Sequence, residues 1–287
     1  QMALLWLCCQ AIGRFPYSLS PARKAALATA GLITGFAWFL FTLLNTWLFN
    51  DGFDLIIPAS YGWQVQEWLQ LILPYASFIY LLLLIFPIRH FIRNFRYVSW
   101  VRQQGISKIS VEWRLFTRNT AERMGIRKPV RIWLSELVSS PVTIGYLKPV
   151  ILIPVAAVSQ LSPAMMEAVI LHELSHIRRY DYLLNLVTRF IRTILYFNPF
   201  VSAFQQVIEQ EREKDCDDMV LQFRYDAAGY ATALLLLEQS GRKTAPLLMP
   251  VTGQGHELLH RIERILGVAG SSSLISYRRM AGVVAGL

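Results

Sequence analysis

Two long segments without any charged residue constrain the fold of this 287-residue chain more than any other feature. Residues 26–49 and residues 71–88 contain no Asp, Glu, Lys or Arg. As helices that rise ~1.5 Å per residue, both are long enough to cross a hydrocarbon layer of ~30 Å. The alternative is a pair of buried helices in a soluble core, but uncharged runs of this length are hard to place there. We therefore expect two membrane spans, preceded by a partial span at residues 2–12.

The charges beside these segments predict how the chain crosses the membrane. The net charge is +9, and basic residues follow the second run at once. Since basic flanks mark the cytosolic side, loop 13–25 and the chain after residue 89 are expected inside, and the acidic loop 50–70 outside. A basic balance also suits nucleic-acid binding, but no helix-turn-helix, zinc-finger or RNA-binding signature is present, so we expect no direct nucleic-acid contact. The basic residues after the second run are Arg89, Arg93, Arg96, Arg102 and Lys108.

Composition divides the chain into three parts. Residues 1–92 are expected to be the membrane anchor, residues 93–277 have the mixed composition of a soluble α+β domain, and residues 278–287 begin a further apolar run that we interpret as another transmembrane helix. Both ends lie in apolar stretches, so we expect the sequence to be a piece of a longer protein. Two of the three cysteines are adjacent and the third is distant, which indicates no disulfide framework and fits a reducing compartment.

Within the soluble part, a small sheet is expected before a central helix. Ser162 and Pro163 are typical of a helix start, and Gly125 and Gly241 of helix ends. The expected strands are residues 130–134, 142–146 and 150–153, and the expected helices are residues 112–124, 163–179, 182–196, 199–221, 227–239 and 256–266, with a loop at residues 241–255.

The central helix carries the main chemical signal, the sequence HELSH at residues 172–176. Residues four apart lie on one face of a helix, so His172 and His176 can bind the same Zn²⁺ ion. Glu173 follows the first histidine and can act as the general base that takes a proton from the attacking water. The pattern predicts a zinc-dependent hydrolase that cleaves peptide bonds.

A catalytic zinc site needs a third protein ligand and an open position. Three acids of the helix expected at residues 199–221, namely Glu209, Glu213 and Asp217, are spaced by four and share one face. This face could supply a carboxylate to the metal, or it could be an exposed salt-bridge surface. Asp181 is too close in sequence to His176 to fold back easily onto the same ion.

A second match to the zinc pattern, HELLH at residues 256–260, has to be weighed against the first. Its downstream sequence offers only Glu263, on the same helix, as a further ligand. We interpret this match as part of an amphipathic surface helix. His90 lies at a membrane boundary and is expected to be interfacial.

Several motifs together resemble the membrane metallopeptidases of the BlaR/MecR type. These motifs are HELSHIRRYD at residues 172–181, Asn198-Pro199, REKDCD at residues 212–217, GYLKP at residues 145–149 and Ile153-Pro154. The downstream Glu followed four residues later by Asp is also similar to the CAAX-protease and heat-shock membrane proteases. The resemblance covers about residues 71–287.

This resemblance implies roles for individual residues. Glu213 becomes the third zinc ligand, and Asp217 either an additional ligand or a hydrogen-bond partner of a ligand. Asp181 would orient a ligand imidazole through its free N–H. Arg212 is a candidate oxyanion stabiliser, with a surface ion pair as the alternative. Cys216 is expected to pack in the core.

The resemblance also implies a zincin-like (gluzincin) domain with one Zn²⁺ per chain, carried by a helical anchor in the bacterial inner membrane and facing the cytosol. The expected function is a membrane endopeptidase of a signalling system that cleaves a cytosolic protein, with a transcriptional repressor as the candidate substrate. The polar loop at residues 241–255 is a candidate site of self-cleavage, and an inert linker is the alternative. A homodimer is compatible with this. The alternative is a non-proteolytic membrane signalling protein with a structural zinc.

The substrate is expected to bind as an added strand along a sheet edge before the catalytic helix. This edge was expected to extend over residues 142–153. The residues proposed to contact the substrate are Val142, Thr143, Ile144 and Gly145.

Overall fold

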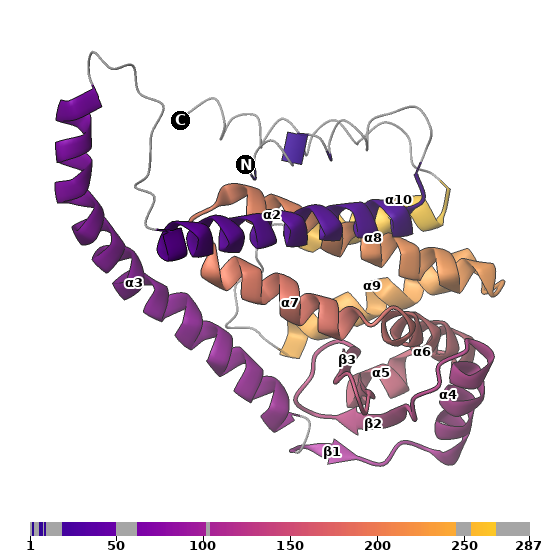
Figure 1. The fold of residues 1–287 in the computed structure, drawn as a ribbon. Coiled ribbons are helices and arrows are strands. Elements are labelled where there is room, and N and C mark those ends of the chain that lie inside the picture. The colour runs from indigo at the N-terminus through magenta and orange to yellow at the C-terminus, as the bar shows by residue number, and fades with distance from the viewer. Residues whose placement is uncertain are drawn as a thin grey trace. The chain divides into compact units, whose positions relative to one another are not determined.

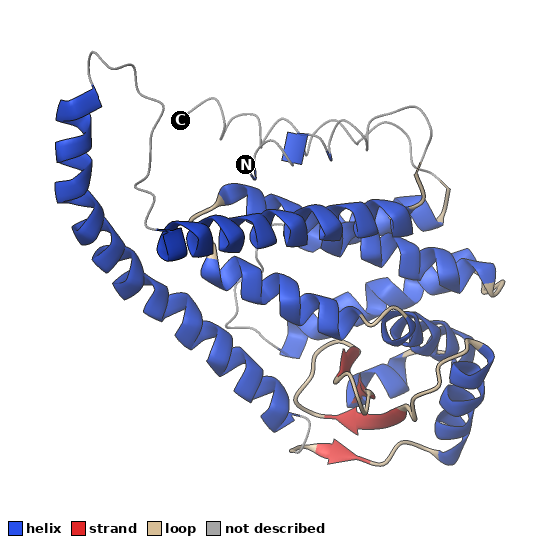
Figure 2. Cartoon of the chain, in the orientation of Figure 1, coloured by secondary structure: helices blue, strands red, loops and turns tan. Residues whose placement is uncertain are grey.

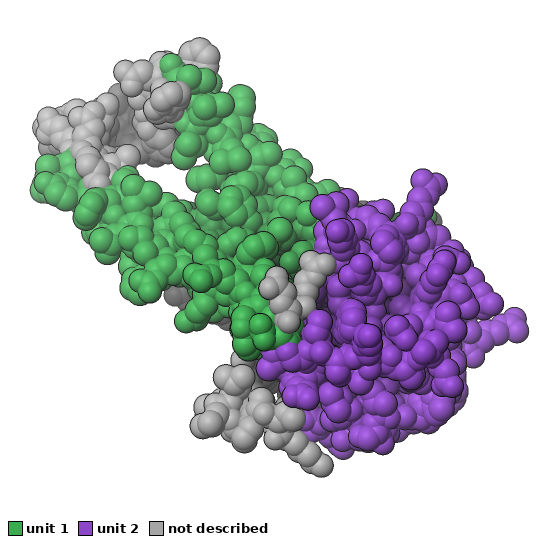
Figure 3. Space-filling model, turned by 90° about the horizontal axis from the view of Figure 1, so that it is seen from below, with its two compact units in different colours: residues 1–104, 182–213 green, residues 105–181, 214–287 purple. Residues whose placement is uncertain are grey.

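A computed structural model describes residues 19–49, 62–101, 104–244 and 254–267, together with Met2, Trp6, Leu7 and Cys9. The chain forms two compact units (Figure 3). The first comprises residues 1–104 and 182–213, and the second comprises residues 105–181 and 214–287. Each unit therefore takes two stretches of sequence, which differs from the contiguous division at residues 92 and 277 expected from composition.

The first unit is helical. It contains α2 (Pro21–Phe49), α3 (Gly62–Val101), all but the first residue of α7 (Asp181–Ile194), and the larger part of α8 (Pro199–Gln222). Two of its segments, Pro21–Asn45 and Tyr75–Val101, are apolar and long enough to cross a membrane. These segments overlap the expected spans, although α3 continues well beyond residue 88 as one unbroken helix (Figure 1).

Two close contacts hold the helices of this unit together. The Tyr80 hydroxyl of α3 donates a hydrogen bond of 2.6 Å to the backbone carbonyl of Ile194 in α7, and its ring stacks on Tyr196. At Gly31 in α2, an added Cβ would lie 3.1 Å from the Phe204 ring of α8, so the absence of a side chain favours this close approach. The expected partial span at residues 2–12 and the apolar run at residues 278–287 lie largely or wholly outside the described residues.

The second unit contains a four-stranded sheet and five whole helices among its described residues (Figure 2). The strands are β1 (Ile106–Ser107), β2 (Arg131–Ser135), β3 (Val142–Ile144) and β4 (Val150–Pro154), in the order β1-β2-β4-β3. Strand β4 is parallel to β2 and antiparallel to β3. The expectation that residues 142–153 together form an exposed edge is therefore wrong for β4. This strand lies between two neighbours, and only β3 forms that edge.

The helices of this unit are α4 (Val111–Arg123), α5 (Val155–Gln160), α6 (Pro163–Arg178), α9 (Ala227–Thr244) and α10 (Gln254–Ile265). Gly125, with a φ of +75°, follows α4 as expected for a helix terminator. Gly241 does not end α9, which continues to Thr244. An isolated glycine costs a helix only about 1 kcal/mol, and helix-forming neighbours can outweigh that cost. Of the expected loop at residues 241–255, residues 245–253 lie outside the described residues.

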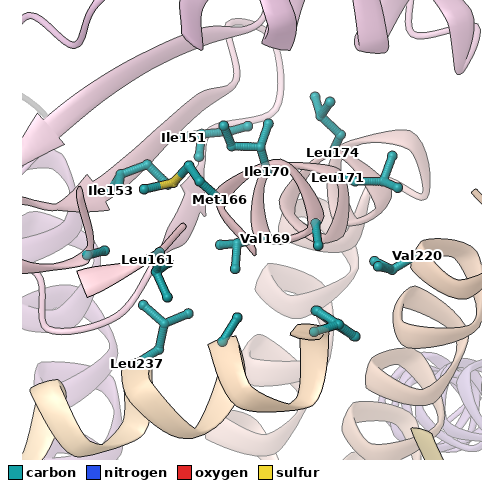
Figure 4. Packing of buried hydrophobic residues seen from close by; sticks show 14 of the residues in the cluster. Ile151, Ile153, Leu161, Met166, Val169, Ile170, Leu171, Leu174, Val220 and Leu237 are labelled. Carbon is teal, nitrogen blue, oxygen red and sulfur yellow. The ribbon is translucent and has the colours of Figure 1, made fainter. Parts of the chain in front are cut away.

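Helix α6 lies at the centre of the second unit and starts as its sequence predicts. Ser162 accepts a hydrogen bond from the backbone N–H of Met165, and Pro163 occupies the first turn. Apolar side chains then cover several faces of the helix, where Ile170 packs near β4 and Val169 packs toward α9 (Figure 4). A helix buried on several sides presents its polar residues in a dry interior rather than to bulk water.

Candidate metal centre

The two histidines of α6 form a close pair. His172 and His176 are one helical turn apart, and their Nε2 atoms lie 3.2 Å from each other. The ring of His172 is buried, with 7% of the residue exposed. Both rings therefore direct the same nitrogen toward one point beside the helix.

The opposite nitrogen of each ring contacts a carboxylate or a group bound to one. His176 Nδ1 lies 2.7 Å from Asp181 Oδ2. His172 Nδ1 lies 2.9 Å from the Tyr230 hydroxyl and 3.4 Å from Asp217 Oδ1. Since the Tyr230 hydroxyl itself donates to Asp217 at 2.7 Å, its oxygen can accept a hydrogen bond from the N–H at His172 Nδ1. Both rings then carry their proton on Nδ1, as metal-ligating histidines usually do.

This arrangement fits a bound zinc ion. With protons on both Nδ1 atoms, the two Nε2 atoms each turn a lone pair toward the other, which is unfavourable unless a cation lies between them. Two nitrogens that bind one tetrahedral Zn²⁺ at ~2.0–2.1 Å are about 3.3 Å apart, close to the separation found here. The donor set and its spacing therefore suit a bound metal ion.

Asp217 is held in a dense network of its own. Arg261 of α10 donates to both of its oxygens, from Nη2 to Oδ1 at 2.8 Å and from Nε to Oδ2 at 3.0 Å. Burial alone would raise the pKa of this carboxyl. The hydrogen bonds with His172 and Arg261, together with their charges, outweigh burial and hold the pKa below its usual range. Asp217 is thus a buried carboxylate whose two oxygens already have partners.

Glu173 lies next to the strand at the edge of the sheet. Its side chain is largely buried, and Thr143 of β3 donates a hydrogen bond of 2.8 Å to its Oε2. The same hydroxyl lies 3.3 Å from the backbone carbonyl of Glu173. A single threonine therefore connects the expected substrate strand with the expected general base.

Two groups of described residues have donor atoms suited to a metal ion, namely His172, His176 and Glu213, and His176, Asp181 and Cys216. The second group uses His176 Nδ1, which Asp181 already occupies, and Cys216 Sγ lies 3.5 Å from the same nitrogen. Cys216 is fully buried, as expected for a core residue. Glu213 is the last residue of the first unit, and it lies on α8 one helical turn before Asp217.

The remaining candidates from the sequence fall in varied places. Arg212 is buried and donates to Asn185 at 2.7 Å, so it does not lie at the surface. His260 of the second zinc pattern has half of its side chain exposed and pairs with Glu263 at 3.4 Å. Neither metal-binding group of the described residues includes it. His90 is exposed and contacts Asn94 on its own helix.

Sequence reasoning did not identify Tyr230 and Arg261 as part of this site. Both lie on helices that follow α8, and they are 13 and 44 positions from Asp217 in the sequence. The available signal was weak. An arginine directly after His260, in a helix interpreted as a surface element, gave no reason to expect a buried partner.

The sequence of the chain is similar to a family of peptidases. The model of the family described as BlaR1 peptidase M56 matches residues 59–265. The methicillin resistance mecR1 protein of Staphylococcus aureus is 25% identical over 148 residues, which cover 51% of this chain and 25% of that protein. The regulatory protein BlaR1 of Bacillus licheniformis is 34% identical over 100 residues, or 35% of this chain and 16% of that protein. The chain thus matches a quarter or less of the length of these relatives.

Proposed function

Because this chain belongs to the BlaR1 peptidase M56 family, we propose that it is a zinc-dependent endopeptidase anchored in a membrane. In this proposal His172, His176 and Glu213 hold one Zn²⁺ per chain, and Glu173 is the general base. The domain around α6 is then a zincin-like fold of the gluzincin type, in which the third ligand is a glutamate.

The pair of imidazoles is the observation that carries this proposal. Their Nε2 atoms converge at 3.2 Å while both Nδ1 atoms face carboxylate-linked partners. An exposed or purely structural histidine has no need of such orientation on both rings. Bound zinc would supply a Lewis acid that lowers the pKa of water and polarises a peptide carbonyl.

The assignment of Glu213 rests on the geometry of α8. Cys216 Sγ lies near His176 Nδ1, and Asp217 Oδ1 lies near His172 Nδ1. Residues three and four positions earlier on a helix share that face, and Glu213 is the residue that meets both spacings. Its carboxylate is a hard oxygen donor of the kind that completes a zinc site with two histidines.

The residues of the chain then divide the work of hydrolysis. Glu173 takes a proton from the attacking water and passes it to the leaving amine. Thr143 orients this carboxylate through the hydrogen bond to Oε2. Asp181, Asp217 and Tyr230 hold the two rings, so that the ligand nitrogens stay in place when substrate binds. Arg212 as an oxyanion stabiliser remains a prediction.

Membrane attachment and orientation belong to the same proposal. Helices α2 and α3 would cross the bacterial inner membrane, with the peptidase domain on the cytosolic side because basic residues follow the second span. The substrate is then a cytosolic protein, plausibly a transcriptional repressor. A homodimer is compatible with this arrangement.

Substrate recognition is proposed to use the edge strand β3. This strand pairs only with β4 in the described sheet, and Val142, Thr143, Ile144 and Gly145 follow that edge toward Glu173. An extended peptide added there would lie beside the general base. Self-cleavage is proposed between α9 and α10, the two helices that flank residues 245–253 in the sequence.

The alternative function, a signalling protein with a structural zinc, would be favoured by a fourth protein ligand. Asp217 was the residue expected to close such a site. Its oxygens are instead engaged by Arg261 and Tyr230, which argues against Asp217 as a fourth ligand. This observation favours the enzyme.

The experiment that tests the proposal compares wild type with Glu173→Gln in detergent. Metal content is measured together with cleavage of casein and of the chain itself, and fragments are identified by N-terminal sequencing. We expect equal zinc in both proteins and cleavage by wild type alone. Equal cleavage by both would contradict Glu173 as the base, and zinc-loaded wild type without any cleavage would favour the structural role.

A further inference from the structure

A large basic cavity lies within the first unit, between the second half of α3 and helices α7 and α8. Its volume is about 1360 Å³, and its lining includes five arginines and a single acid. The arginines are Arg89, Arg93, Arg96, Arg189 and Arg192, and the acid is Glu209. We infer that this cavity binds the phosphodiester headgroup of an anionic membrane lipid.

The arginines are not used to stabilise the protein through ion pairs. Among the described residues, none of the five has a carboxylate partner within salt-bridge distance. Arg192 donates to the amide oxygen of Gln205 at 3.3 Å, and Gln205 in turn donates to Glu209 at 2.8 Å. The one acid of the lining is therefore engaged by a neutral amide. All five arginines are exposed, and five like charges around one cavity favour the binding of an anion.

Membrane topology explains only part of this charge. Arg89, Arg93 and Arg96 follow the second apolar run and match the cytosolic flank of a span. Arg189 and Arg192 lie on α7, about 90 residues further along the chain, where no span begins or ends in the described sequence. The positive-inside rule gives no reason for them to face the same cavity. A shared anionic ligand does.

The level of the cavity relative to the membrane fits a lipid headgroup. The uncharged run at residues 71–88 is about 27 Å long as a helix, which matches the hydrocarbon layer, and Arg89 follows it directly. Phe86, Ile92 and Tyr196 supply apolar and aromatic surface to the same lining. A lipid could place its phosphate among the guanidinium groups, which bind phosphate in a bidentate manner, and its acyl chains along α3.

The inference can be tested on the chain purified in a zwitterionic detergent. Phosphatidylglycerol and phosphatidylcholine with identical acyl chains are titrated, and bound lipid is counted by native mass spectrometry. The variant Arg93→Gln/Arg189→Gln/Arg192→Gln removes three charges from the cavity. The control Arg114→Gln/Arg123→Gln/Arg127→Gln removes three exposed charges in and after α4.

We expect wild type and control to prefer phosphatidylglycerol. The cavity variant should bind it about 100-fold more weakly, because each arginine near an anionic lipid contributes about a factor of five. If the cavity variant does not fold, Arg93→Lys/Arg189→Lys/Arg192→Lys keeps the charge and should show a smaller loss, since lysine cannot bind phosphate in a bidentate manner.

Three results would overturn the inference: equal binding of the two lipids, an unchanged preference in the folded cavity variant, or complete displacement of the lipid by inorganic phosphate at the same concentration. The last would indicate a site for small anions. None of these results depends on zinc or on peptidase activity.

Discussion

Thr143 Oγ1 lies 2.8 Å from Glu173 Oε2, so the strand at the edge of the sheet is directly connected to the carboxylate proposed as the general base. A hydrogen bond from a neutral donor to a carboxylate fixes its direction inside a buried site. The same threonine belongs to the strand on which we expect the substrate to pair. In the proposed function, this one side chain would couple substrate binding to proton transfer.

Replacing Thr143 tests this coupling. Thr143→Val keeps the shape of the side chain and removes the donor, so we expect kcat to fall about tenfold to 100-fold while zinc content stays constant. Thr143→Ser restores the hydroxyl and should recover most of the rate. Steady-state kinetics on one peptide measures all three proteins, and a valine variant with the wild-type rate would exclude the positioning role.

Tyr230 should matter for metal binding rather than for folding alone. Its hydroxyl connects His172 Nδ1 with Asp217 Oδ1, so Tyr230→Phe should weaken zinc affinity by about 10- to 100-fold. Tyr225→Phe is a matched control, because that hydroxyl donates to Glu167 at 2.9 Å and contacts no metal ligand. Competition with a fluorescent chelator gives both affinities. Equal losses in the two variants would mean that the effect is general destabilisation.

Removing the metal should destabilise the peptidase domain. An ion that binds only the native form stabilises it by about 2.7 kcal/mol at 100 times the dissociation constant. We therefore expect a chelator to lower the unfolding temperature by several degrees, and added zinc to restore it. His260→Ala should respond as wild type does, whereas His176→Ala should show no response. A chelator effect that depends on His260 would move the site to α10.

The edge-strand hypothesis predicts that the effect of peptide modification on KM alternates from one position to the next. Backbone amides of an added strand point alternately toward and away from β3, so N-methylation of a cleaved peptide should raise KM at every second position. Methylation at the intervening positions should have little effect. A uniform response along the peptide would argue against strand addition.

Local signals in the sequence predicted much of this structure. Helix α6 begins at the expected cap because Ser162 and Pro163 act through neighbouring backbone groups alone. The spacing of His172 and His176 sets their common face for the same reason. The uncharged runs likewise correspond to long helices, although residues beyond Ile88 continue α3, since no glycine or proline interrupts the sequence there.

Long-range relations could not be predicted in this way. The parallel pairing of β4 with β2 depends on how a hairpin is placed, and the expected edge was too wide as a result. Arg261 directly follows the segment that resembled a second zinc motif, yet its guanidinium binds Asp217, 44 positions away. Nothing local to either residue indicates that pairing. The same holds for the arginines of α3 and α7 around one cavity.

Zinc content of purified protein tests the central claim most directly. Elemental analysis of wild type, Glu173→Gln and Glu213→Gln should give about one zinc per chain for the first two and a strongly reduced content for the third. The reason is that Glu213 is a proposed zinc ligand and Glu173 is not. The Glu209→Gln variant is a control on the same helix and should keep its zinc. Full zinc occupancy and unchanged affinity in Glu213→Gln would contradict the account.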